Sequence, residues 1–112
     1  MIVGGSSHRL AQSSYCWQTT CADFVPPRCG DGRTPSIRVR RGVLVHFRLG
    51  FSTRELVLTV GDPAQHRPVR LRTTPPIRWE VTRGGVALLF ARAKTGGDSS
   101  YAACLKLLPR SR

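Results

Sequence analysis

Cysteine is the residue type in this sequence whose number and spacing point most directly to a chemistry. The chain has 112 residues and four cysteines, Cys16, Cys21, Cys29 and Cys104. An even number of cysteines in a short chain is typical of a disulfide framework in an exported protein. No Cys-x-x-Cys pair occurs and the three histidines lie outside zinc-finger spacing, so the sequence indicates no zinc site.

Four cysteines allow three pairings, and the sequence alone does not prove one of them. We favour Cys16–Cys21, which would clamp a tight hairpin. The second bond is then Cys29–Cys104, which would tie the N-terminal region to the last strand. In the loop-entropy description, the short loop contributes about 2 kcal/mol and the long loop about 4.5 kcal/mol to stability.

Arginine is the second residue type with a notable pattern. The chain has 18 basic and six acidic residues, a net charge of +12, and sixteen of the basic residues are arginine. The guanidinium group matches the oxygen geometry of phosphates and carboxylates, which favours anion binding. A genome rich in arginine codons would give the same composition, and net charge by itself indicates only non-specific association.

Four basic side chains are predicted to form one outward patch: Arg38, Arg40, His46 and Arg48. Because side chains alternate between the two faces of a strand, Arg38 and Arg40 are expected on the polar face of the first strand. His46 and Arg48 are expected on the polar face of the next strand for the same reason. A tight turn at residues 41–42 is predicted to pair the two strands, with cross-strand neighbours about 5 Å apart. The patch is a hypothetical anion-binding surface, and a solvated face in an arginine-rich protein is the alternative.

Other site chemistries find little support in the sequence. A Gly-x-Ser-x-Gly nucleophile elbow is absent, and the single methionine, Met1, leaves no Cys-x-His-x-Met cluster for copper. The sequence therefore indicates no catalytic residue, no metal ligand and no cofactor.

The elements that would position these residues are short strands. Alternation of period two, broken by glycine and proline, predicts strands at residues 14–17, 21–25, 36–40, 43–49, 55–60, 69–72, 77–81, 86–93 and 101–108. The apolar run at residues 86–93 is expected to be a central strand covered on both faces. No segment repeats its apolar residues at the spacing that a helix would need. We therefore predict an all-β, disulfide-stapled antiparallel sandwich, immunoglobulin-like or related.

The domain organisation follows from the same segments. Residues 1–12, rich in glycine and serine, are predicted to be a flexible leader. Residues 13–108 form the single sandwich domain, and residues 109–112 are a basic tail. Residues 1–10 contain no apolar core of a signal peptide, so an exported protein would have had its signal or anchor removed.

A short motif resembles a known class of proteins. Ser14-Tyr15-Cys16-Trp17, followed by Cys21-Ala22-Asp23-Phe24, resembles the start of uncharacterised secreted or lipoprotein β-rich domains of Gram-positive bacteria. The match covers about a tenth of the chain. The resemblance implies a location at the cell envelope and assigns no catalytic or binding residue.

Together these observations favour a secreted or envelope-associated binding module. Its expected partner is a protein or an anionic envelope polymer. A nucleic-acid-binding basic domain is the second hypothesis, and a small secreted enzyme is the third. No apolar run reaches the roughly 18 residues that a transmembrane segment needs.

Overall fold

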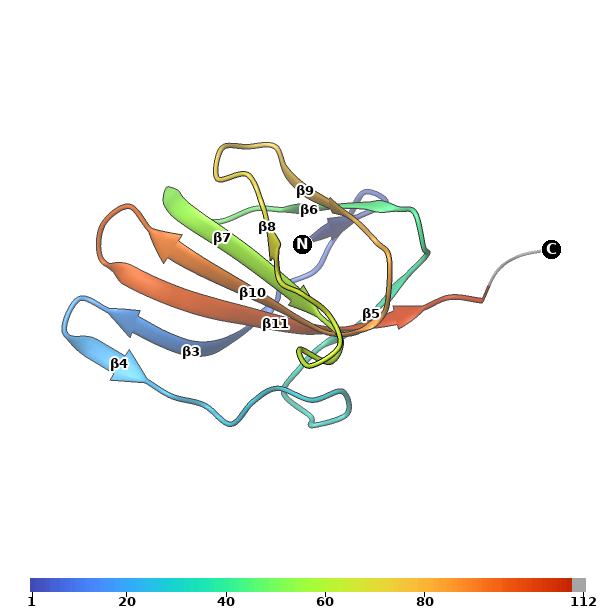
Figure 1. The fold of residues 1–112 in the computed structure, drawn as a ribbon, viewed down its shortest axis with the longest axis horizontal. Helices are drawn as coiled ribbons and strands as arrows, with labels where there is room; N and C mark the ends of the chain where they lie inside the picture. The colour runs from blue at the N-terminus through green and yellow to red at the C-terminus, as the bar shows by residue number, and fades with distance from the viewer. Residues whose placement is uncertain (110–112) are drawn as a thin grey trace.

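Two packed β-sheets make up the computed structural model, which describes residues 1–109 (Figure 1). The strands of these residues are β1 (Ile2–Val3), β2 (Ser6–Ser7), β3 (Ala11–Trp17), β4 (Thr20–Ala22), β5 (Ser36–Val39), β6 (Leu44–Phe47), β7 (Thr53–Val60), β8 (Val69–Arg70), β9 (Ile77–Glu80), β10 (Gly85–Ala93) and β11 (Gly97–Leu107). Sheet A has the order β2-β1-β6-β9. Sheet B has the order β4-β3-β11-β10-β7-β8, with β5 paired to β11 beside it.

The strands form because alternate residues are apolar and reach the space between the sheets. In β7, Leu56, Leu58 and Val60 are buried while the residues between them are partly exposed. From sheet A, Val45 faces the same core and is fully shielded from solvent. Burying each such side chain contributes about 1.5–3 kcal/mol relative to leaving it in water.

Disulfides staple this sandwich at two places. Cys16 pairs with Cys21 across the β3–β4 hairpin, and Cys29 pairs with Cys104 of β11. The predicted all-β, disulfide-stapled sandwich and both predicted bonds are confirmed, whereas the immunoglobulin-like character stays a prediction. Within residues 1–109, no helix is long and apolar enough to cross a membrane.

The first residues are folded, so the predicted flexible leader at residues 1–12 is wrong. β1 and β2 form a hairpin around Gly4 and Gly5, whose φ angles of 54° and 83° suit glycine. β1 also pairs with β6, and Met1 belongs to the buried core. The glycine–serine run is therefore a tight turn between apolar residues that need burial. Of the predicted basic tail, residues 110–112 lie outside the described residues.

β5 does not pair with β6, which corrects the predicted hairpin. β5 runs parallel to the end of β11, with Ser36 opposite Cys104 and Val39 opposite Leu107. β6 lies in sheet A between β1 and β9. The turn at Gly42, where the amide bonds to the carbonyl of Val81, carries the chain from one sheet to the other.

β10 is central, as predicted, but only one of its faces is buried. Ala87, Leu89 and Ala91 face the core, whereas Val86, Leu88 and Phe90 on the other face are partly exposed. The loop of residues 24–34 lies over the neighbouring strand β11, at Ala102 and Cys104, and leaves the outer face of β10 accessible.

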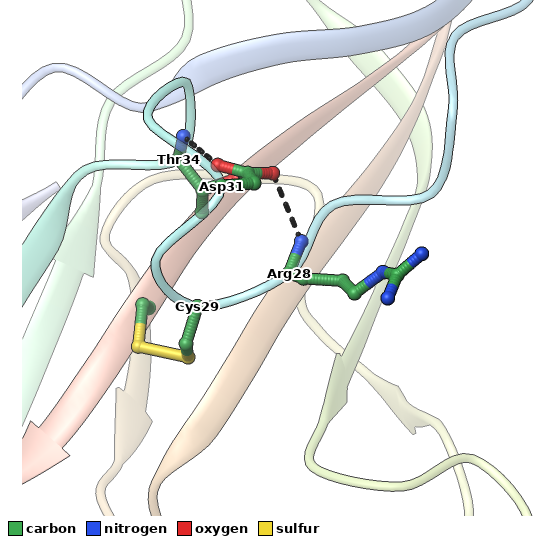
Figure 2. Close-up of a disulfide and its surroundings, with 5 residues drawn as sticks. Arg28, Cys29, Asp31 and Thr34 are labelled. Atoms are coloured by element: carbon green, nitrogen blue, oxygen red, sulfur yellow. Dashed lines mark hydrogen bonds between the residues drawn. A yellow bond between two sulfur atoms is a disulfide. The ribbon is translucent and has the colours of Figure 1, made fainter.

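The loop between β4 and β5 is held by a bond and by a carboxylate (Figure 2). Cys29 fixes the loop covalently to β11. Asp31 accepts hydrogen bonds from the main-chain nitrogens of Arg28 at 3.0 Å, Arg33 at 2.9 Å and Thr34 at 2.7 Å. The hydroxyl of Thr34 donates a further bond at 2.9 Å. A segment without regular structure thereby satisfies its backbone groups locally.

Candidate functional site

The four basic residues predicted to form one patch lie at two separate places. Arg38 lies on β5, in register with Lys106 of β11, and Arg40 follows the end of that strand. His46 lies on β6, between Ile2 and Arg78 in register, and Arg48 follows the end of β6. Because β5 and β6 belong to different sheets, the predicted common face is wrong. Apolar and polar residues alternate in the same way in two strands of one hairpin and in two strands that belong to opposite sheets. The pattern therefore could not distinguish these two arrangements.

His46 and Arg48 do come together, in a groove at one end of the sandwich. This groove, of about 870 Å³, is called the Arg48 groove, and its basic lining residues are His46, Arg48 and Lys94. Its walls come from the end of β6 and the following connection, the segment before β9, and the turn after β10. Three segments far apart in the sequence therefore build one site.

Two hydrogen bonds join these walls. The hydroxyl of Thr53, at the start of β7, donates to the carbonyl oxygen of Thr73 at 3.3 Å. The amide of Lys94 donates to the carbonyl oxygen of Ser52 at 3.0 Å. Thr53 is 3% exposed, so its bond is shielded from competing water. These bonds hold the walls of the groove together, and the side chains of Arg48 and Lys94 on these walls are exposed.

The floor of the groove is apolar. Its apolar lining residues are Ile2, Phe47, Leu49, Phe51, Pro75, Pro76 and Ile77. Phe51 packs edge-on against Trp17, with ring centroids 5.3 Å apart and planes at 70°. Phe47 and Ile77 are buried in the core. Part of this apolar lining therefore continues the core, whereas Pro75 and Pro76 are exposed.

The charge of the groove is positive and uncompensated. Arg48 and Lys94 are exposed, and no aspartate or glutamate is among the lining residues of the groove. In residues 1–109 the ion pair present is Arg70–Glu55, at 3.4 Å, which belongs to the β7–β8 pair. Arg48 and Lys94 lie next to an apolar surface and have no acidic partner in the groove. Such cations attract an anion and repel a cation.

Residues 1–109 contain no group of three or more His, Cys, Asp or Glu side chains that could hold a metal ion. The groove offers a histidine and hydroxyl groups but no carboxylate among its lining residues. A Ser-His-acid arrangement would need a carboxylate to orient the histidine. What the groove can do chemically is hold anionic and hydroxyl groups by charge-assisted and neutral hydrogen bonds.

Sequence reasoning missed Lys94 and the hydroxyl residues Thr73 and Thr74 of this groove. Lys94 follows β10 in a turn, and the two threonines precede a proline pair. No spacing in the sequence links them to residues 46–48, because the contacts that bring them together are made by loops.

No protein-family profile, curated protein or solved structure matches the chain.

Proposed function

We propose that this protein is an extracellular or envelope-associated binding module that holds an anionic partner in the Arg48 groove. The observation that carries the proposal is the pairing of uncompensated cations, Arg48 and Lys94, with a concave apolar floor. Scattered surface arginines would give only diffuse attraction. A hollow lined by cations adds a defined place where an anion meets several donors at once.

The disulfides and the overall charge support this role. Two disulfides in a small domain are compatible with an oxidising compartment outside the cytoplasm. The net charge of +12 raises the rate at which polyanions approach the protein, and the effect weakens as salt is added. Among anionic partners, a polymer such as an acidic envelope polysaccharide gains most, because several of its charges are bound together.

Nucleic acid is the second candidate, favoured by the same charge. Proteins that bind single strands without sequence preference present free aromatic faces on which bases stack. In the Arg48 groove, Phe47 is buried and Phe51 packs against Trp17. Neither ring is fully exposed, and we therefore take an acidic polysaccharide as the first candidate.

A comparison of two charge-matched variants tests the proposal. Arg48→Gln/Lys94→Gln removes two cations from the groove, and Arg38→Gln/Arg40→Gln removes two exposed cations elsewhere. All four side chains are exposed, so both variants should keep the fold. On a heparin column the groove variant is expected to elute at lower salt than the control. Its slope of log affinity against log salt should become shallower by about 1 for each cation that had neutralised a charge of the polymer.

Equal elution of the two variants would contradict the proposal, since bulk charge would then account for the retention. A circular dichroism spectrum unchanged from the original protein is needed for both. Competition by single-stranded DNA and by an acidic polysaccharide of equal charge then separates the two candidate partners.

A further inference from the structure

A second hollow adjoins the Arg48 groove. It measures about 550 Å³ and shares with that groove the residues Ile2, Phe47, Arg48, Leu49 and Gly50. The two hollows therefore adjoin at the segment that leaves β6, and we call this shared segment the ridge. On the far side of this ridge the basic lining residues are His8 and Arg9, and we call that side the Arg9 hollow.

The N-terminal hairpin places these residues. β1 pairs with β6, which brings the segment after β2 beside the end of β6. The amide of His8 donates to the carbonyl oxygen of Met1 at 2.7 Å, and the main-chain nitrogen of Met1 donates to the carbonyl oxygen of His8 at 2.8 Å. This reciprocal pair fixes the backbone from which Arg9 projects. Arg9 is exposed, and the Arg9 hollow also contains no acidic lining residue.

We propose that the partner is a linear acidic polysaccharide that crosses the ridge and occupies both hollows, with Arg48 at its centre. The inference rests on the proposed function and adds the linear shape of the ligand and the second hollow that it occupies. Arg48 lines both hollows, so the cations form one series, from Arg9 through Arg48 to Lys94. A small anion reaches only part of this series, whereas a chain with a charge on each unit meets all of it.

The remaining lining residues favour sugar over bases. Hydroxyl groups come from Ser7 on one side and from Ser52, Thr73 and Thr74 on the other. They can donate to and accept from sugar hydroxyls. Ile2 and Leu49 line both hollows and offer apolar surface to the C–H faces of sugar rings. Of the aromatic residues Phe47 and Tyr101 that line the Arg9 hollow, Phe47 is buried, and Tyr101 is partly buried and packs against the core.

Binding of oligogalacturonates of graded length, measured by calorimetry at low salt, tests this inference. For the original protein, affinity should rise with chain length until both hollows are filled, at one long chain per protein. Arg9→Gln and Lys94→Gln should each weaken the long chain by roughly two- to fivefold, as expected for an exposed charge contact. Arg38→Gln, the matched control, should leave the gain with length unchanged.

The outcomes separate this inference from the proposed function. If Arg9→Gln has no more effect on the long chain than Arg38→Gln, the ligand does not cross the ridge, although Arg48→Gln still weakens binding. If Arg48→Gln also behaves like the control, the proposed function fails as well. Tighter binding of single-stranded DNA of equal charge, with the same dependence on Arg9 and Lys94, would overturn the choice of a polysaccharide.

Discussion

At the residue scale, Asp31 is the side chain whose chemistry is most clearly altered by the fold. Bonds from the main-chain nitrogens of Arg28, Thr34 and Arg33 lower the pKa of its carboxyl well below the usual range. Asp31→Asn should loosen the loop, because the amide group keeps only one accepting oxygen where the carboxylate has two. Faster hydrogen exchange of the Arg28 and Thr34 amides, seen by NMR, is the expected result. Asp23→Asn, at the start of the same loop, serves as the control.

The pH dependence of this loop follows from the direction of the shift. The folded pKa of Asp31 is lower than the unfolded value of about 3.9, so its contribution is fully present above that value. It is lost only as the pH falls through the lower, folded pKa. Protection of the Thr34 amide should therefore persist at mildly acidic pH and disappear at more acidic pH. Loss of protection already above the unfolded pKa would show that the carboxylate does not hold the loop.

At the scale of the element, burial distinguishes one strand from another. Leu56 of β7 is fully buried, whereas Leu44 of β6 is 47% exposed. Leu56→Ala should lower the free energy of unfolding by about 2–5 kcal/mol, because it leaves a cavity in the core. Leu44→Ala changes the same atoms on the surface and should cost far less. Urea denaturation of both variants measures the difference, and equal losses would place Leu44 in the core as well.

From β3 onward, the sequence predicted the strands well and their pairing poorly, and it missed β1 and β2. Residues 36–40 and 43–49 alternate as expected and become β5 and β6. Their partners are β11 for one strand and β1 and β9 for the other, and these lie far away in the sequence. Alternation reports which face of a strand is buried, but it does not report which strand lies beside it.

The candidate site was predictable only in part for the same reason. His46 and Arg48 were identified because strand alternation turns them outward. Arg9 and Lys94 lie in connections, where no period exists, and only the pairing of β1 with β6 and the packing of the turns bring them near Arg48.

At the scale of the whole molecule, the two disulfides differ in what they constrain. Cys29–Cys104 closes a sequence separation of 75, and Cys16–Cys21 a separation of five. Replacing both cysteines of a bond by alanine should cost about 4.5 kcal/mol for the long loop and about 2 kcal/mol for the short one. Cys104 is also 2% exposed, so its replacement loses core packing in addition. Unfolding of each double variant in urea, without reductant, gives the two values.

A larger loss for the short loop would contradict the loop-entropy account. The β3–β4 hairpin would then contribute more to stability than its position at the edge of sheet B indicates.

The position of β11 has a consequence for how the nascent chain acquires its structure. β11 lies between β3 and β10 and also pairs with β5, yet it ends only at Leu107. Because the N-terminal end of a chain is synthesised first, sheet B lacks its middle strand until almost all of the described residues have emerged. Cys29 cannot form its native bond until Cys104 has been synthesised. Early closure of Cys16–Cys21 would occupy both nearby thiols, so that Cys29 is left with its native partner alone.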